Sequence, residues 1–265
     1  MDVERFIFED LGYADITSDA LLGNQIGSAK IIANEAGVVA GVSEAEQIFS
    51  YFDLQTFVYK TDGTKINAGD IILEVNGTLK SILSAERTAL NFMMRMSGIA
   101  TTTHELASRL SHAKVAATRK TTPGFREFEK KAVILGGGDP HRFCLDDLIL
   151  IKDNHIAILG GIAEAVSKAK SYSFTKKVEV EVESLAEAKT AVDAGADIIM
   201  LDNMTPEQAK ECFNLIKSLN SQIYVEVSGN ITPETAPAYD DCADIISLGW
   251  ITHSVRSLHF SLDVV

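Results

Sequence analysis

Beyond about residue 100, the chain alternates short apolar runs with amphipathic stretches. The amphipathic stretches, such as SLAEAKTAVDAGA and TPEQAKECFNLIKSL, have the periodicity of helices. Strands and helices that alternate at a spacing of roughly 20 to 30 residues predict βαβ units and a parallel sheet. Because no GxGxxG loop follows a strand, we expect an incomplete α/β barrel rather than an open sheet. The five expected strands are LILIK (148–152), VEVEV (178–182), DIIMLD (197–202), IYVEVS (223–228) and DIISLG (244–249).

The first 100 residues have a different pattern, in which helix and strand signals are mixed. The pairs Asp62-Gly63 and Asn76-Gly77 are typical of tight turns, so we expect them to flank the strands FVYK and IILEV in antiparallel hairpins. Ser84 is expected to cap a helix that ends at Gly98, because serine favours the start of a helix and glycine its end.

The change of pattern predicts two domains. The polar run Thr101–Thr103 separates them, which gives a first α/β domain at 1–100 and a barrel domain with the active site at 101–254. The C-terminal tail, 255–265, is expected to be able to pack back onto the first domain.

Composition narrows the class of protein. The chain has 265 residues, 46% of them hydrophobic, and a formal net charge of -13, which argues against general nucleic-acid binding. Its first residues, MDVERFIFED, do not resemble a secretory signal, and no apolar run approaches the roughly 20 residues of a membrane span. The cysteines are three in number and widely spaced, which is typical of free thiols in a reducing cytosol. We therefore expect a cytoplasmic protein.

One segment reverses the charge of the chain. Between residues 112 and 142, seven cations face three acids, a net charge of +4 that leaves -17 for the rest. Cations gathered among Gly and Pro in an acidic protein predict a site for a small, highly charged anion. Lys130 and Lys131 are interpreted as part of a solvated helix face. The seven cations are Lys114, Arg119, Lys120, Arg126, Lys130, Lys131 and Arg142.

Candidate chemistry follows the expected strands. In an α/β barrel, the active site is built at the carboxyl ends of the strands and in the loops beyond them. Those ends provide one cation, two acids and three small residues whose backbone can approach a phosphate: Lys152, Glu181, Asp202, Ser228, Gly229 and Gly249.

Each of the two acids also has an interpretation in which it plays only a structural part. In VEVEVES, the valines share one strand face and the glutamates the other, so Glu181 points into the barrel if the valines pack against the outer helices. The alternative is an edge strand with solvated acids. Asp202 could instead cap the helix that begins near Thr205-Pro206.

Loops add further candidates. Arg119 and Lys120 end the probable strand VAATRK, and His141-Arg142 follow three glycines that allow a close backbone approach or simply end a helix. Asp153 and His155 can be ligand contacts or loop polar groups.

Eight ordered blocks resemble the quinolinate phosphoribosyltransferase family. They are ERTALNFMMRMSGIAT, TRKTTPGFR, GGG-x-x-HR, LIKDNHI, VEVEVES, IIMLDN, EVSGNI and SLGWITHS, and they span essentially the whole chain. The resemblance implies transfer of phosphoribosyl from 5-phosphoribosyl-1-pyrophosphate to quinolinate, which yields nicotinate mononucleotide, pyrophosphate and CO2 in NAD biosynthesis. It also implies an N-terminal α/β sandwich, an open barrel, Mg²⁺, and a homodimer or higher homo-oligomer.

The resemblance also implies a role for each matching residue. Lys120, Lys152, Glu181 and Asp202 are the implied catalytic residues. Lys120 meets the pyrophosphate, while Glu181 and Asp202 hold the ribose hydroxyls and the metal. Arg87 reaches the pocket from the neighbouring subunit. The quinolinate carboxylates are held by Arg119, His141, Arg142 and Lys152, and the 5-phosphate by Ser228, Gly229, Gly249 and His253.

The residues leave rival functions open. A molybdenum-uptake-associated paralogue shares the fold, but its members lack the arginine of the ERTALN block and the KDNH sequence, both present here. A nicotinate phosphoribosyltransferase would not need so many cations. A Schiff-base aldolase would use Lys152 as its nucleophile. A regulator that only binds a ligand would not require the acids at 181 and 202. One departure from the family pattern, Asp139-Pro140 before His141, lies beside the expected site.

Overall fold

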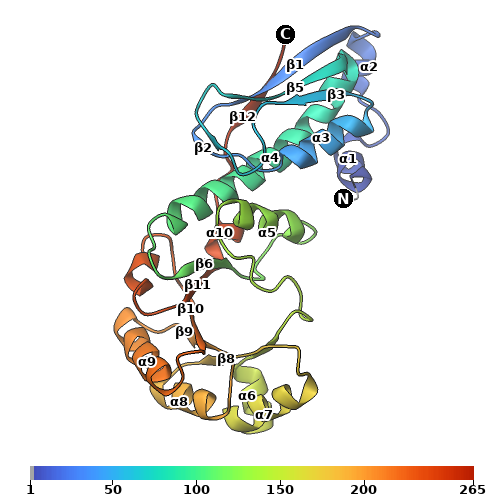
Figure 1. Cartoon of the computed structure of the whole chain (residues 1–265). Coiled ribbons are helices and arrows are strands. Elements are labelled where there is room, and N and C mark those ends of the chain that lie inside the picture. The colour runs from blue at the N-terminus through green and yellow to red at the C-terminus, as the bar shows by residue number, and fades with distance from the viewer. Residues whose placement is uncertain (1–2) are drawn as a thin grey trace. The chain divides into compact units, whose positions relative to one another are not determined.

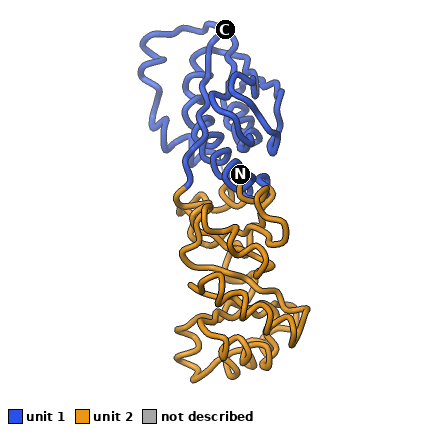
Figure 2. The backbone as a smooth tube through the Cα atoms, turned by 90° about the vertical axis from the view of Figure 1, so that its left-hand side faces the viewer, with its two compact units in different colours: residues 1–104, 131–136, 255–265 blue, residues 105–130, 137–254 orange. Residues whose placement is uncertain are grey.

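The structure is a computed structural model that describes residues 3–265. The chain forms two compact units, shown in different colours in Figure 2. The first unit comprises residues 1–104, 131–136 and 255–265, and the second comprises residues 105–130 and 137–254. Residues 131–136 and 255–265 therefore belong to the first unit, although they come after the start of the second unit in the sequence.

The first unit is built on a four-stranded antiparallel sheet (Figure 1). Its strand order is β12 (Phe260–Val264), β1 (Ile26–Ala33), β5 (Ile71–Thr78) and β3 (Gln55–Val58). A separate two-stranded ladder joins β2 (Gly37–Val38) and β4 (Lys65–Ile66). The helices are α1 (Glu4–Leu11), α2 (Ile16–Leu21), α3 (Val42–Tyr51) and α4 (Leu79–Ala107).

The core of this unit lies between the sheet and α3 and α4 (Figure 1). Alternate residues of β1, including Ala29, Ile31 and Ala33, are fully buried, as are Ile48 and Phe49 on α3. This alternation is the signature of a strand with one face on the core. The C-terminal strand β12 completes the sheet by pairing with β1.

Two glycines that suggested breaks lie inside regular elements. α4 begins before Ser84 and continues through Gly98, so both predicted helix ends were wrong. A β-carbon on Gly98 would collide with the backbone of Arg256, which shows that the glycine permits a close chain crossing. Gly77 also forms no turn, because it lies in β5 and pairs with Gly27.

The turn at Asp62-Gly63 is confirmed. The Thr64 amide donates to the Thr61 carbonyl at 3.1 Å, and Gly63 has a φ of +85°. Such a φ costs a glycine little and most other residues more. Thr101–Thr103, by contrast, form no linker, because they lie within α4.

The second unit is the predicted incomplete α/β barrel (Figure 1). Its six strands are all parallel to their neighbours, in the order β6-β11-β10-β9-β8-β7. The five strands expected from the apolar runs and the probable strand VAATRK are all present. They are β6 (Lys114–Ala117), β7 (Ile149–Ile151), β8 (Val178–Val182), β9 (Ile198–Asp202), β10 (Tyr224–Ser228) and β11 (Ile245–Leu248).

Helices connect these strands on the outside of the curved sheet (Figure 1). Val178, Val180 and Val182 of β8 are buried, and β8 lies between β7 and β9. The alternative of an edge strand with solvated acids was therefore wrong. The helices are α5 (Arg126–Leu135), α6 (Asp153–Leu159), α7 (Ile162–Tyr172), α8 (Leu185–Asp193), α9 (Pro206–Leu219) and α10 (Trp250–His253), with a 3-10 turn at Ala236–Tyr239.

Among the described residues, none of the helices combines the length and the apolar character that a membrane crossing needs.

Gly98→Ala tests the close crossing. Alanine in an ordinary helix interior is about 1 kcal/mol more stable than glycine. Here the added methyl would displace the Arg256–Ser257 backbone, so we expect a loss of about 1–3 kcal/mol in the free energy of unfolding. Urea unfolding measures the change, with Thr102→Ala on the same helix as a control. A stabilised Gly98→Ala protein would show that the crossing imposes no constraint.

Candidate active site

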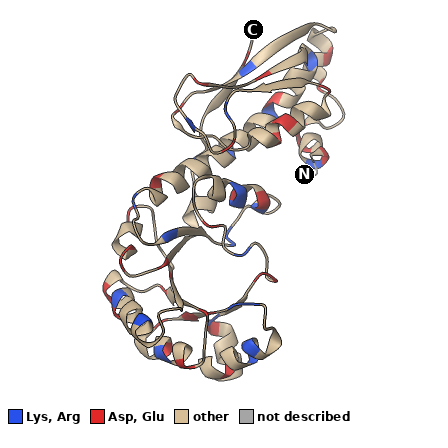
Figure 3. Ribbon diagram, viewed as in Figure 1, with Lys and Arg blue, Asp and Glu red and all other residues tan. Residues whose placement is uncertain are grey.

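A cavity of about 590 Å³ opens at the carboxyl ends of the parallel strands. Charged residues occur on the outer helices of this unit and also on the strands and loops inside the curve of the sheet (Figure 3). The cavity is lined by Ala117, Thr118, Arg119, Lys120, His141, Arg142, Leu150, Lys152, Glu181, Met200, Asp202, Asn203, Glu226, Ser228, Gly229, Asn230 and Ser247.

Most of the predicted site residues line this cavity. Gly249 and His253 lie beside it: a β-carbon on Gly249 would come within 2.9 Å of Lys120 Cδ and 3.1 Å of His253 Nε2. Arg87 lies on α4 in the first unit, where its Nη2 is 3.7 Å from Glu86 Oε1. The predicted residues in the lining are Arg119, Lys120, His141, Arg142, Lys152, Glu181, Asp202, Ser228 and Gly229.

Three cations of the cavity form no ion pair with any of the described residues. Within residues 3–265, the side chains of Arg119, Lys120 and Arg142 form no ion pair, and Arg119 Nε is buried without a hydrogen-bond partner. Burial, followed by the charge of Arg119, lowers the pKa of Arg142. Cations that are partly removed from solvent, as Arg119 and Arg142 are, and that repel one another favour the binding of an anion.

The carboxylates lie on the neighbouring strands β8 and β9. Lys152 Nζ donates to Glu181 Oε2 at 2.7 Å, and burial and the charge of Glu181 raise the pKa of Asp202. Asn203 Nδ2 donates to Asp202 Oδ2 at 2.7 Å, while Asn203 Oδ1 accepts a hydrogen bond from Asn230 at 2.9 Å. The two asparagines thus orient Asp202 toward the cavity side of the sheet.

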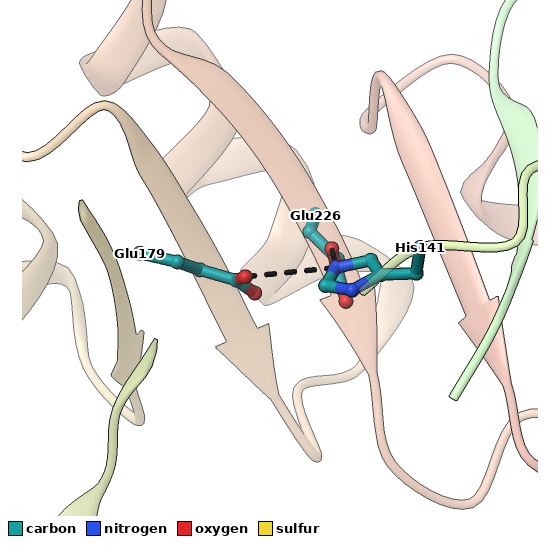
Figure 4. A group of neighbouring side chains, drawn as sticks. All are labelled: His141, Glu179 and Glu226. Atoms are coloured by element: carbon teal, nitrogen blue, oxygen red, sulfur yellow. Dashed lines mark hydrogen bonds and ion pairs between the residues drawn. The ribbon is translucent and has the colours of Figure 1, made fainter. Parts of the chain in front are cut away.

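His141 is held by two buried glutamates (Figure 4). Its Nε2 is 3.0 Å from Glu226 Oε2 and 3.5 Å from Glu179 Oε2. The Arg142 backbone amide donates to His141 Nδ1 at 2.8 Å, so the ring proton lies on Nε2, toward the glutamates. Both ring nitrogens therefore have protein partners.

These three residues are also the one group of three or more neighbouring potential metal ligands among the described residues. Because Nδ1 accepts from Arg142, only Nε2 faces the carboxylates, and its proton occupies the position that a metal would take. Burial opposes a charge on His141, but the hydrogen bond and charge of Glu226 outweigh it and raise its pKa. Burial and the charge of Glu226 raise the pKa of Glu179 to about 8.

The interpretation as part of a solvated helix face was wrong for Lys130 and incomplete for Lys131, whose side chain is 35% exposed but forms ion pairs. Lys130 is fully buried in the second unit, where its Nζ donates to the carbonyl oxygens of Pro140 and Arg142. Lys131 lies in the first unit, with its Nζ 2.8 Å from Glu44 Oε1 and 3.2 Å from Asp62 Oδ2. The acceptors of Lys130 lie 10 and 12 residues away in the sequence, and the acidic acceptors of Lys131 lie 87 and 69 residues away.

The structural alternatives of other residues are also resolved. Thr205, not Asp202, caps α9, since its side chain accepts from the Gln208 amide. His155 lies in the first turn of α6, where its Nδ1 accepts from the Lys152 amide at 3.0 Å.

Sequence reasoning missed Glu226, Asn203 and Asn230. Glu226 had a signal, because Val225-Glu226-Val227 repeats the Val-Glu-Val pattern of β8. The sequence contains little signal for the two asparagines, since each lies in the loop after a strand. Both adopt a left-handed φ, of 54° and 52°.

Comparisons with known proteins agree with this architecture. The model of the quinolinate phosphoribosyl transferase N-terminal domain matches residues 15–97, and that of the C-terminal domain matches residues 99–263. A probable nicotinate-nucleotide pyrophosphorylase (carboxylating) of Methanothermobacter thermautotrophicus is 45% identical, over 100% of this chain and 98% of its own. The human nicotinate-nucleotide pyrophosphorylase (carboxylating) is 37% identical, over 98% and 89%. The crystal structure of NadC from Streptococcus pyogenes has a TM-score of 0.93 and 41% identity, and the match covers 99% of this chain and 95% of that one.

An incomplete barrel with cations and carboxylates around its strand ends, together with these relatives, defines a phosphoribosyltransferase, a class of pentosyltransferase. The chain belongs to the quinolinate phosphoribosyl transferase family.

Glu179→Gln tests the buried acid pair through the pH dependence of stability. Between the ordinary Glu pKa of 4.5 and the folded value of about 8, the folded protein keeps a proton that the unfolded chain releases. The free energy of unfolding therefore falls as pH rises through this window. We expect the melting temperature of Glu179→Gln to fall less than that of wild type between about pH 5 and about pH 8.5.

Glu183→Gln is the matched control, because Glu183 is exposed at the end of the same strand. Identical pH profiles for wild type and Glu179→Gln would contradict the raised pKa.

Proposed function

We propose that the protein transfers the phosphoribosyl group of 5-phosphoribosyl-1-pyrophosphate to the ring nitrogen of quinolinate. The products are nicotinate mononucleotide, pyrophosphate and CO2. The observation that carries this proposal is the set of three cavity cations, Arg119, Lys120 and Arg142, that have no counter-ion in residues 3–265. Quinolinate has two adjacent carboxylates and the other substrate has phosphates, so both need such cations.

The two arginines suit the diacid. A planar guanidinium can donate two parallel hydrogen bonds to one carboxylate, which an ammonium group cannot do. Lys152, whose Nζ donates to Glu181, is a further cation in the lining of the cavity. His141 already uses both ring nitrogens, so we infer that it contributes to this subsite chiefly through its contact with Arg142.

The strand ends suit the phosphoribosyl group. Glu181 and Asp202 would accept hydrogen bonds from the ribose hydroxyls, and Lys120 would contact the pyrophosphate. Ser228 and Gly229, with Gly249 and His253 beside Lys120, would receive the 5-phosphate. Gly229 supports this role because its backbone lines the cavity at a φ of +93°, and a β-carbon there would collide with Asn203 Oδ1.

Magnesium fits the pair Glu181 and Asp202. Both offer carboxylate oxygens to the cavity, and the pKa of Asp202 is raised by burial and then by Glu181, so a cation between them would relieve repulsion. Mg²⁺ prefers oxygen ligands and commonly shares them with substrate phosphates. When bound, it would supply charge neutralisation for the departing pyrophosphate.

The protein needs no nucleophile for this reaction. The bond from ribose C1 to pyrophosphate breaks, and the quinolinate nitrogen forms the new bond. The carboxylate next to that nitrogen then leaves as CO2, and the ring carbon that carried it takes up a proton from solvent. Ribose C1 becomes cationic as pyrophosphate departs. The protein therefore acts by positioning both substrates and by placing carboxylates near the developing positive charge.

A turnover assay tests the proposal. Wild-type protein with quinolinate, phosphoribosyl pyrophosphate and magnesium should form nicotinate mononucleotide and CO2 in equal amounts, and removal of the metal should stop the reaction. Arg142→Lys should keep the fold but lose about 100-fold in kcat/KM, because it loses the bidentate contact. Circular dichroism checks the fold. Wild-type kinetics in Arg142→Lys would remove this arginine from the substrate site.

Arg87 is proposed to complete the cavity of a neighbouring subunit in a homodimer. Mixing inactive Arg87→Ala with inactive Lys120→Ala would then create heterodimers that contain one intact site. Random mixing should restore about a quarter of wild-type activity, because half of the dimers are mixed and each has one intact site of two. No recovery in heterodimers separated by affinity tags would place Arg87 outside the neighbouring site.

A further inference from the structure

Lys130 is a fully buried ammonium group to which the proposed chemistry gives no role. Its Nζ donates to the carbonyl oxygen of Arg142 at 2.8 Å and also to that of Pro140. These two carbonyls flank His141, whose φ of +51° is unusual for a residue with a β-carbon. Lys130 thus holds the backbone on both sides of a strained residue that touches the cavity.

Neighbouring residues of α5 hold the other cation-bearing loop. Glu129 accepts hydrogen bonds from the Thr122 amide at 3.0 Å and from its hydroxyl at 2.9 Å. Arg126 joins the two loops, because Nε donates to Thr121 Oγ1 at 2.9 Å and Nη1 donates to the Phe143 carbonyl at 3.1 Å. One turn of α5 therefore fixes the segments that present Arg119 and Arg142.

The charge of Lys130 matters as well as its hydrogen bonds. Burial, followed by the charge of Arg126, lowers its pKa to about 8, so the group remains charged at neutral pH. An apolar side chain would avoid the cost of burying a charge but would leave the two carbonyls without this donor. Stability of the core alone would not require an ammonium group at this position, next to the loop that carries Arg142.

We propose that Lys130 is a positioning residue for the diacid subsite: it clamps the Pro140–Arg142 backbone and so sets the direction of the Arg142 guanidinium. This role rests on the proposed function. It predicts a defect confined to the diacid, because Glu181, Asp202 and Ser228 lie on strands that Lys130 does not contact through hydrogen bonds.

Lys130→Met is the direct test, since methionine fills a similar volume without charge or donors. We expect the KM for quinolinate to rise on the order of 100-fold, because misplacing a binding group by about 1 Å costs that much. The KM for phosphoribosyl pyrophosphate should stay within about threefold of wild type. Lys131→Met is the matched control, since its acidic partners lie in the first unit, and it should retain both wild-type KM values.

An unchanged KM for quinolinate in Lys130→Met would overturn the proposal, and so would an equal rise in both KM values. If the methionine variant does not fold, Lys130→Arg carries the same test. A cation with several donors should preserve the fold, while its larger head group shifts the clamped backbone and raises only the KM for quinolinate. Wild-type or equally raised KM values in that variant would also overturn it.

The two proposals fail in different ways. If wild-type protein forms no nicotinate mononucleotide, the proposed function is wrong. If wild type is active and Lys130→Met has wild-type kinetics, only the positioning role is wrong.

Discussion

Cations that lie close together without ion-pair partners raise the free energy of the folded protein. In the second unit, contacts from α5 keep such cations in place. Arg119 and Arg142 approach closely enough for one to lower the pKa of the other. Side chains in such an arrangement would move apart if their backbones were free. Their backbones are not free, because α5 secures both loops through the buried pair Glu129 and Lys130. The free energy of folding thus keeps Arg119 and Arg142 close together although neither forms an ion pair with a described residue.

The two halves of the cavity have different origins. The acids Glu181 and Asp202 end strands of a parallel sheet, so hydrogen bonds between strands set their spacing. The cations Arg119, Lys120 and Arg142 lie in or beside loops, whose conformation depends on side-chain contacts from α5. Regular structure therefore positions the acids of the cavity, and buried charged contacts from α5 position its cations. A change at Lys130, which holds only the Pro140–Arg142 backbone, should consequently alter the use of the acceptor more than the use of the phosphoribosyl donor.

Much of this arrangement was predictable from local patterns. Apolar runs identified the strands of the barrel, and their last residues gave Lys152, Glu181 and Asp202, since the carboxyl ends of parallel strands share one edge. Features that depend on a second segment were missed. We predicted a helix end at Gly98 and a turn at Gly77 because the segments that contact them, at Arg256 and Gly27, are distant in sequence. Lys130 looked like a surface residue because its carbonyl acceptors belong to a loop that follows three glycines.

The central claim is that unpaired cations select a ligand with two adjacent carboxylates. Titration calorimetry of the free wild-type protein, without phosphoribosyl pyrophosphate, tests it most directly by comparing quinolinate with nicotinate. Nicotinate lacks the carboxylate next to the ring nitrogen, so it should bind about 100-fold more weakly, because one cation of the cavity then stays unpaired. Equal affinities for the two acids would contradict the account.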